Sequence, residues 1–343
     1  MRVTSWDGDA FRARVQAALD EFLGEMTERL APLGRDASRL LDEARGAVSG
    51  GKRFRAAFCY WGYRGVRPDV EDEHALVRAC AALELLHASA LVHDDYMDAS
   101  DTRRGRPATH RAFTAEHRAD RWRGDPEQYG ASAAILLGDL LLSWADEMLR
   151  RCGLPVAEVS AAMDVFDVCR SEVIAGQFLD VSVQARGLAD VDTAMTVLRF
   201  KSAKYSIERP LHIGAALAGA SADTLTALSS FGLPLGEAFQ LRDDLLGVFG
   251  DADTTGKPAG DDLIEGKRTV LVALALDAAG PEDAITLDRM LGTPLDGGQV
   301  ARARRIIDES GAHAQVEMVI KELADRARVV LRELASAATQ RVV

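Results

Sequence analysis

Apolar side chains recur every three or four residues along nearly the whole chain of 343 residues, which is the spacing of a helix with one buried face. One such series runs from Leu76 to Ala90, and another runs from Ile135 to Met148. We find no segments in which β-branched or aromatic residues alternate with polar ones between turns, as strands require. The pattern therefore predicts an all-α protein.

Glycine and proline divide the chain at intervals, for example at Gly50-Gly51, at Gly153 to Pro155 and at Gly256 to Gly260. These breaks indicate roughly ten to thirteen helices. None of them is long or of low complexity, so we expect a single domain over residues 1–343. Hydrophobic residues make up 48% of the chain, which is enough for a large core.

Charge and cysteine usage exclude several classes of protein. The formal net charge of -12 argues against a nucleic-acid partner, which requires extended basic surfaces. The four cysteines show no Cys-x-x-Cys spacing, which fits a reducing, cytoplasmic location. Residues 1–33 mix acidic and basic residues with an apolar stripe at helical spacing from Phe11 to Met26, which is not the pattern of a secretory signal. Each apolar run is interrupted before the length of a membrane span, so we expect no such span.

Two aspartate pairs follow apolar segments, and the first is the more complete. In a helix, Asp94 and Asp98 lie one turn apart on one face, with Asp95 beside them. Magnesium favours carboxylate oxygens combined with bridging phosphate, so this face is a candidate magnesium site. A lone pattern of this kind is more often a solvated helix end, but the second pair favours the metal-binding interpretation.

The second pair, Asp243-Asp244, has Gly247 where the first has its third aspartate. We therefore expect Asp243 to be the principal ligand, with Asp244 in support. Asp251 lies two turns beyond Asp243 if the helix continues that far. A glycine, a proline and basic residues follow both pairs, so each pair precedes a basic turn.

Basic residues occur in short, separate motifs, as expected if they balance diphosphate charge. Lys52 and Arg55 share a helical face behind two glycines and are placed to grip a phosphate. The adjacent Arg103 and Arg104 diverge, which allows each to face a different anion. Taken singly, each motif is weak and fits a solvated turn. The other basic candidates are Lys201, Lys257 and Lys267.

Together these motifs resemble those of the trans-isoprenyl diphosphate synthases, in particular the bacterial geranylgeranyl diphosphate synthases, over nearly the whole chain. The resemblance implies the isoprenoid synthase fold, in which a helical bundle surrounds a central substrate cavity, and it implies a homodimer. The matching motifs are Gly-Gly-Lys-Arg-x-Arg, Asp-Asp-x-x-Asp followed by Asp-x-Arg-Arg-Gly-x-Pro, Gly-Gln-x-x-Asp, Lys-Ser-Ala, and Gln-x-x-Asp-Asp with Gly-Lys and Gly-Lys-Arg downstream.

The resemblance also implies a reaction and its site. Isopentenyl diphosphate would condense head-to-tail with an allylic diphosphate (dimethylallyl, geranyl or farnesyl) by ionisation, condensation and elimination, with about three Mg²⁺ ions per site. Ser202, Tyr205 and Gln240 would stabilise the allylic cation, and Gln177 and Asp180 would support Lys201. The implied ligands are Asp94, Asp98 and Asp243 for magnesium; Arg103, Lys201 and Lys257 for the allylic diphosphate; Lys52, Arg55, His87 and Arg104 for isopentenyl diphosphate; and Lys267 as a further substrate-binding lysine.

The side chains that precede Asp94 on its helix indicate the length of the product. Ala90, Leu86 and Leu83 lie on nearly the same face at successive turns of about 5.4 Å, close to one isoprene unit each. Ser89 and Ala90 are small, where relatives that stop at fifteen carbons commonly carry an aromatic residue. Leu86 and Leu83 are larger. We therefore expect geranylgeranyl diphosphate, with a longer or a C15 product as alternatives. Otherwise these residues belong only to the hydrophobic core and do not determine product length.

Two related classes of protein fit part of the pattern. A class I terpene cyclase shares the first aspartate motif, but its second motif differs from Asp243 to Gly247, and it lacks the isopentenyl diphosphate site indicated by Lys52, Arg55 and Arg104. A non-catalytic subunit of a heteromeric synthase would have degraded aspartates, which here are intact apart from Gly247.

A carboxylate-bridged di-iron bundle is the third alternative, because Glu71-x-x-His74 and Glu84-x-x-His87 match its ligand pairs. The two pairs are only a few helical turns apart, whereas such a bundle needs them on facing helices. We therefore interpret Glu84 as structural and His74 as exposed.

Overall fold

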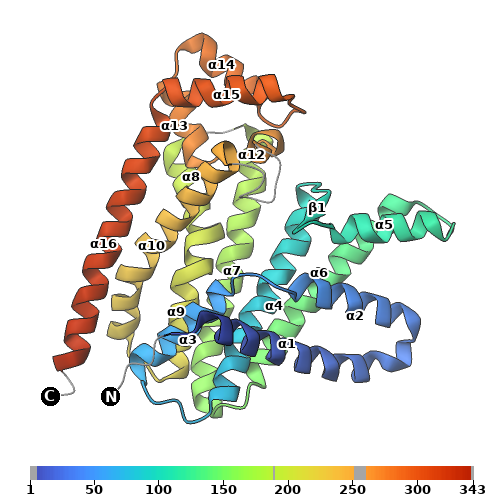
Figure 1. The fold of residues 1–343 in the computed structure, drawn as a ribbon, viewed down its shortest axis with the longest axis vertical. Helices are drawn as coiled ribbons and strands as arrows, with labels where there is room; N and C mark the ends of the chain where they lie inside the picture. Colours follow the sequence, from blue (N-terminus) through green and yellow to red (C-terminus); the bar gives the residue numbers. More distant parts are fainter. Residues whose placement is uncertain (1–5, 188–189, 251–259, 341–343) are drawn as a thin grey trace. The chain divides into compact units, whose positions relative to one another are not determined.

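The structure is a computed structural model that describes residues 6–187, 190–250 and 260–340 (Figure 1). Most of these residues are helical, so the predicted all-α class is confirmed. The strands in the described ranges are the two-residue β1 (Thr102–Arg103) and β2 (Arg106–Pro107), which form an antiparallel hairpin. The chain divides into two compact units, one of Met1–Met163 with Ile213–Gly219 and one of Asp164–His212 with Ala220–Val343.

The first unit is built from helices that pack around α4. The apolar stripe predicted for the N-terminal segment is buried from Phe11 to Met26 on α1, whose first turn is capped by Asp7. Helices α1, α3 and α6 contact α4. The elements of this unit are α1 (Gly8–Leu30), the 3-10 turn η1 (Ala31–Leu33), α2 (Arg35–Val48), α3 (Phe54–Val66), α4 (Glu73–Met97), the β1–β2 hairpin, α5 (Thr109–Ala119), α6 (Pro126–Arg150) and the start of α7 (Val156–Arg186).

Helix α4 is the most buried helix of this unit. It starts at the Asp72 cap and buries nearly every side chain between Ala75 and Val92. Its length and apolar composition would suffice to cross a membrane, but 83% of its most apolar window is buried inside the protein, as in a core helix. The expectation that every apolar run falls short of a span overlooked this helix, and its burial accounts for the composition.

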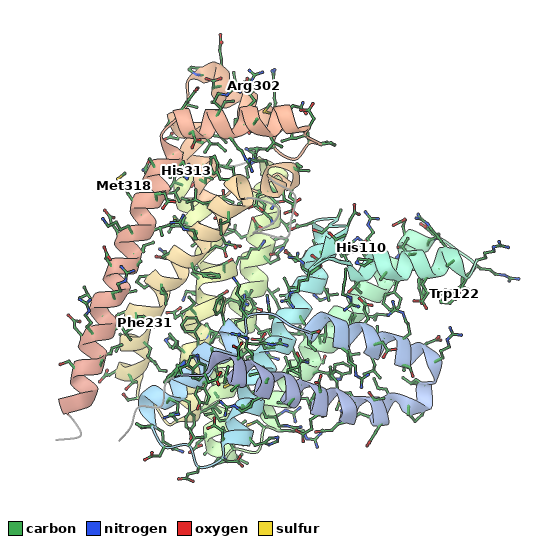
Figure 2. The ribbon with its side chains drawn as sticks, in the orientation of Figure 1. His110, Trp122, Phe231, Arg302, His313 and Met318 are labelled. Carbon is green, nitrogen blue, oxygen red and sulfur yellow. The ribbon has the colours of Figure 1, made fainter. Side chains whose placement is uncertain are left out.

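The second unit packs α10 against η2 and α16. At the end of α10, Phe249 stacks on His313 of α16, with ring centroids 4.3 Å apart; Figure 2 labels His313. Helix α8, η2 and α9 follow one another without a gap and differ only in helix type. Glycine and proline breaks do not mark such changes of type, so the described residues contain more elements than the roughly ten to thirteen helices expected. The elements are the rest of α7, α8 (Val191–Val197), the π-helix η2 (Leu198–Glu208), α9 (Arg209–Leu217, which ends in the first unit), α10 (Ala222–Phe249), α12 (Asp261–Glu265), α13 (Val270–Ala278), α14 (Pro281–Met290), α15 (Gly297–Glu309) and α16 (Ala312–Gln340).

Candidate active site

The first aspartate motif forms the C-terminal end of α4. The Asp98 N–H donates to the Asp94 carbonyl at 2.8 Å, so the two residues are one helical turn apart, and both are half-buried. Asp95 is only 4% exposed and accepts a hydrogen bond from Nε of Arg103 at 2.9 Å and a second from Nη2. The predicted geometry, two carboxylates on one face and Asp95 beside them, is confirmed.

The β1–β2 hairpin sends its two arginines in different directions. Its turn residues, Arg104 and Gly105, both have positive φ, as a tight two-residue hairpin turn requires. Arg103 reaches back to Asp95, whereas Arg104 donates from Nη1 to the carbonyl of Ser49 at 2.9 Å. The predicted divergence of the adjacent side chains is therefore confirmed. Arg104 is hydrogen-bonded to the glycine-rich loop that precedes α3.

Positive charge is concentrated around His87 on α4. Burial lowers the pKa of His87 well below its ordinary value, and the nearby guanidinium groups of Arg55, Arg104, Arg103 and Arg53 lower it further. The pKa of Arg104 is itself lowered by burial and by Arg53. Such a cluster of cations around a neutral imidazole is suited to an anion. Within the first unit, the structure thus brings three of the predicted residues, Arg55, Arg103 and Arg104, near His87.

Lys52 lies in the loop that joins α2 to this cluster and is exposed. Gly50 and Gly51 precede it with φ values of 69° and 90°, a region that favours glycine. A Cβ on Gly51 would lie 3.1 Å from Nη2 of Arg104, so the missing side chain admits the guanidinium. The glycine pair therefore shapes the basic loop. The expectation that Lys52 and Arg55 share a helical face is wrong, because α3 begins only at Phe54 and the left-handed backbone of Arg53 separates Lys52 from the helix.

In the second unit, Lys201 lies on the π-helix η2, next to α7. A Cβ on Gly176 would lie 2.5 Å from the Lys201 nitrogen, so glycine lets the two backbones approach. Nζ of Lys201 is 2.5 Å from Oδ2 of Asp180, which confirms the predicted contact between these two residues. The neighbouring Ser202 is half-buried and Tyr205 is 5% exposed. π-Helical segments are rare and often mark functional sites.

The second aspartate pair lies near the end of α10. Asp243 is exposed, whereas Asp244 is buried and accepts a hydrogen bond from Nε2 of Gln240 at 2.8 Å. Burial raises the pKa of Asp244 to about 8, and the nearby carboxylates of Asp262 and Asp243 also raise it. Of the two, Asp243 is thus the one available to a ligand from solvent, as expected from the sequence.

Gly247 does not leave an empty space in the second motif. A Cβ at Gly247 would lie 1.9 Å from Oδ2 of Asp262 on α12. Asp262 in turn accepts a hydrogen bond from Nζ of Lys267 at 3.4 Å, and Lys267 lies 2.5 Å from Oε2 of Glu265. Asp262 was not among the predicted site residues, because its place beside Gly247 depends on how α12 packs against α10. The predicted Lys257, and Asp251, lie outside the described residues.

The residues expected to set product length lie on the buried part of α4. Leu86 and Ser89 are each 3% exposed, and Ala90 is half-buried. Trp144 packs edge-on against Phe22 within the first unit, with ring centroids 6.3 Å apart. That tryptophan is therefore part of the core.

The contacts of Glu84 and His74 do not match a di-iron site. Glu84 forms an ion pair with Arg53, with 3.1 Å between Oε2 and Nη1. His74 contacts Glu21 at 3.1 Å, and its side chain is 66% exposed. The interpretation of Glu84 as structural and of His74 as exposed is therefore confirmed.

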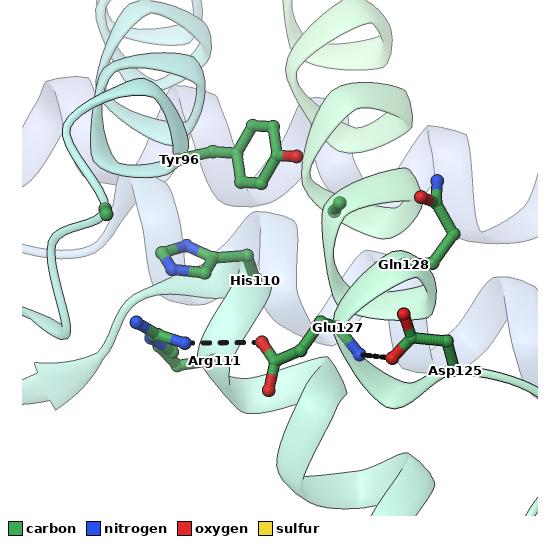
Figure 3. Close-up of a pocket in the computed structure, with 8 residues that line it drawn as sticks. Tyr96, His110, Arg111, Asp125, Glu127 and Gln128 are labelled. Atoms are coloured by element: carbon green, nitrogen blue, oxygen red, sulfur yellow. Dashed lines mark hydrogen bonds and ion pairs between the residues drawn. The ribbon is translucent and has the colours of Figure 1, made fainter.

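A separate pocket of about 230 Å³ lies beside the end of α4 (Figure 3). Arg111 is one of its lining residues and donates hydrogen bonds to Asp101 at 2.8 Å and to Glu127 at 3.3 Å. Its lining contains none of the predicted site residues. The lining residues are Tyr96, Ala99, His110, Arg111, Asp125, Glu127, Gln128 and Ala131.

The first unit carries aspartates one helical turn apart beside paired arginines, and the second unit carries a lysine–aspartate pair and a second aspartate motif. Cations and carboxylates of this kind are suited to anionic substrates bound directly or through a metal ion. Residues 38–309 match the polyprenyl synthetase family, and the chain belongs to that family. It is a prenyltransferase of the trans type.

Individual relatives and one solved structure agree with this assignment. A geranylgeranyl diphosphate synthase of Mycobacterium tuberculosis is 33% identical over 301 residues, 84% of this chain and 79% of the relative. A geranylfarnesyl diphosphate synthase of Aeropyrum pernix is 32% identical over 286 residues, 82% and 83% of the two chains. A geranylgeranyl pyrophosphate synthase of Corynebacterium glutamicum, crystallised with isoprenyl diphosphate and magnesium, superimposes with a TM-score of 0.92 at 41% identity and covers 95% of this chain and 94% of its own.

Proposed function

We propose that this prenyltransferase condenses isopentenyl diphosphate with an allylic diphosphate and releases mainly geranylgeranyl diphosphate. The observation that carries the substrate assignment is the cluster of guanidinium groups around the neutral His87, on the same helix as Asp94 and Asp98. One helix thus carries the centre of a cationic site and, two turns further on, a carboxylate site. Two diphosphate substrates, one held by cations and one held through metal, fit this division.

Asp94 and Asp98 fit magnesium because that ion needs only one or two carboxylates when substrate phosphates and water complete its shell. Asp243 is exposed and offers a further carboxylate, whereas the buried Asp244 is bonded to Gln240. Magnesium, when bound, supplies positive charge that stabilises the departing diphosphate. We assign these three aspartates to about three Mg²⁺ ions, a number taken from the family resemblance.

Arg103 and Lys201 are assigned to the allylic diphosphate. Each is oriented by a carboxylate, Arg103 by Asp95 and Lys201 by Asp180, and such fixed cations stabilise charge that develops on a leaving group. Lys257 is assigned to the same group by its motif. As the allylic carbon–oxygen bond breaks, these cations stabilise the charge on the released diphosphate.

Lys52, Arg55, His87 and Arg104 are assigned to isopentenyl diphosphate, which they bind without metal. The double bond of this substrate attacks C1 of the allylic cation, and a proton lost to the released diphosphate completes a chain five carbons longer. Ser202, Tyr205 and Gln240 are assigned to stabilising the cation and excluding water. The buried ring of Tyr205 and the half-buried Ser202 support this role. Lys267, bonded to Asp262, is a further substrate-binding lysine.

The C20 product rests on the small side chains of Ser89 and Ala90, which leave room for a tail to pass, and on the larger Leu86 below them. Relatives named for C20 and C25 products lie at similar identity, so a longer product is the alternative. The family resemblance also leads us to propose a cytoplasmic homodimer.

The test is to incubate the purified chain with magnesium, isopentenyl diphosphate and each allylic primer in turn, and to size the products. Geranylgeranyl diphosphate from at least one primer supports the proposal. A C15 or C25 end product would overturn the product assignment while leaving the substrates in place. Failure to consume isopentenyl diphosphate with any primer would overturn the substrate assignment as well.

A further inference from the structure

Arg53 lies in the middle of the motif Gly-Gly-Lys-Arg-x-Arg, but its side chain is buried, whereas a residue that binds substrate must be accessible. It is 5% exposed, whereas its neighbour Lys52 is exposed and Arg55 is half-buried. Its backbone is in the left-handed region, with φ 55° and ψ 36°, at the position that precedes α3. Residues other than glycine rarely adopt this conformation, so the surrounding contacts must hold Arg53 in place.

The contacts of the Arg53 guanidinium come from three directions. Nη1 donates to Oε2 of Glu84 at 3.1 Å, and Nη2 donates to Oε1 of Gln16 and to the carbonyl of Val48. The side chains of Arg53 and Glu84 are 4% and 6% exposed. The arginine thereby ties the end of α2, where Val48 lies, to α1 and α4.

Glu84 also completes the start of α3. Its second oxygen, Oε1, accepts the N–H of Ala56 at 3.3 Å. This N–H belongs to the first turn of α3. The side chain of the N-cap residue, Arg53, does not accept a hydrogen bond from the N–H groups of that turn. A carboxylate at a helix N-terminus satisfies a free donor and complements the helix dipole. One carboxylate thus fixes both the loop before α3 and the first turn of α3.

The two contacts of Glu84 are made by Arg53 and Ala56, so they lie on either side of Arg55 in the first turn of α3, and the first of them is next to Lys52. Glu84 is also three residues before His87 on α4, which places it one turn from the third residue of the same site. The Arg53–Glu84 pair is therefore the link between the loop that carries two predicted diphosphate ligands and the helix that carries another.

We propose that Arg53 and Glu84 are positioning residues that fix Lys52 and Arg55 for the diphosphate of isopentenyl diphosphate. This inference rests on the proposed function, because it takes Lys52 and Arg55 as ligands of that substrate. Arg53 contributes through its hydrogen bonds to the frame of the site and makes no contact with the substrate. Loss of the pair misplaces the ligands without removing any of them.

The test compares Glu84→Gln with Glu43→Gln, a matched change. Glu43 is a buried carboxylate of the same unit, 7% exposed and paired with Arg39 at 3.0 Å, and it has no role in the proposed site. We measure Tm, the Kd for isopentenyl diphosphate alone by calorimetry, and kcat with KM for each substrate. In Glu84→Gln we expect the Kd and the KM for isopentenyl diphosphate to rise about 10-fold, with KM for the allylic diphosphate nearly unchanged.

A double variant, Arg53→Met with Glu84→Met, separates positioning from stability. Replacing a buried ion pair by apolar side chains of similar volume often preserves stability, whereas removing one partner does not. We expect its Tm to exceed that of Glu84→Gln while the Kd for isopentenyl diphosphate stays raised. If Glu84→Gln does not fold, the Kd for isopentenyl diphosphate is measured in the double variant and in Arg53→Lys instead. Arg53→Lys keeps the positive charge but loses the guanidinium group that bonds several partners at once.

The outcomes distinguish a failure of the proposed function from a failure of the positioning role of Arg53 and Glu84. If the unaltered protein neither binds nor consumes isopentenyl diphosphate, the proposed function fails and the positioning role fails with it. If the unaltered protein is active and the Arg53 and Glu84 variants that fold keep its Kd, the positioning role alone is overturned. Equal losses in Glu84→Gln and Glu43→Gln, or equal rises in both KM values, would likewise overturn it.

Discussion

The carboxylate of Asp262 occupies the space that a side chain at Gly247 would need, because a Cβ there would lie 1.9 Å from Oδ2 of Asp262. The third position of the second aspartate motif is therefore filled by a residue from α12. Since Asp262 also bonds Lys267, a larger side chain at position 247 would disturb a predicted substrate-binding lysine.

We predict that Gly247→Asp, which restores the usual motif, destabilises the protein by about 1–3 kcal/mol, the usual cost of inserting a group into filled space. Gly24→Ala is the control, because no atom lies within 4 Å of a Cβ at Gly24 on α1. That control should be neutral or stabilising by about 1 kcal/mol. Urea unfolding measures both, and an equally stable Gly247→Asp variant would show that Asp262 moves aside freely.

The pH dependence of stability should carry a contribution from His87. Its pKa is lowered in the folded protein, so below the ordinary pKa of about 6.5 the unfolded chain binds a proton that the folded chain does not. This contribution is present at pH 8 and is lost as the pH falls below about 6.5. His87→Gln should remove it, so the stability difference between pH 8 and pH 5.5 should be smaller in the variant. A difference as large as that of the unaltered protein would contradict the lowered pKa.

Isopentenyl diphosphate should raise the pKa of His87, because a bound anion favours the charged imidazole and opposes the effect of the guanidinium groups. Titration of the His87 ring by NMR, with and without isopentenyl diphosphate, measures the shift. Inorganic sulfate at the same ionic strength controls for screening. An unchanged titration in the presence of bound isopentenyl diphosphate would place its diphosphate away from His87.

The two positions of the first aspartate pair should respond differently to substitution. Asp94→Ala removes a proposed magnesium ligand and should lower kcat by about 10²-fold or more. Asp95→Asn keeps Asp94 and Asp98 but weakens the contact with Arg103, so we expect a smaller loss that is concentrated in the KM for the allylic diphosphate. Steady-state kinetics over a range of magnesium concentrations measures both, with Asp69→Ala, an exposed residue, as control. Near-normal turnover of Asp94→Ala would refute its assignment to magnesium.

Local pattern was enough to predict the helices and part of the site. The apolar stripe from Phe11 to Met26 appeared as the buried face of α1, and the one-turn spacing of Asp94 and Asp98 appeared at the end of α4. Both follow from the period of a single helix. The divergence of Arg103 and Arg104 follows similarly from their adjacency on a short strand and its turn.

Features that depend on packing between elements could not be predicted. Nothing in Gly-Gly-Lys-Arg-Phe-Arg shows that Arg53 turns inward, because its partner Glu84 is 31 residues away on another helix. The position of Asp262 beside Gly247 depends in the same way on how α12 packs against α10. The π-helical stretch around Lys201 has no local marker either, apart from Gly176, whose close contact with η2 only the fold reveals.

Product length offers the last test, at Ser89 on α4. Because Ser89 is small and buried, Ser89→Phe should narrow the space for a growing tail and shift the product from C20 to C15. Overpacking should also cost about 1–3 kcal/mol of stability. Leu86→Ala, one turn lower, should act in the opposite direction and yield longer chains, while Ser89→Ala should leave the length unchanged. Chromatography of the dephosphorylated products measures the distribution. An unaltered distribution in a folded, active Ser89→Phe variant would mean that the tail does not pass this face of α4.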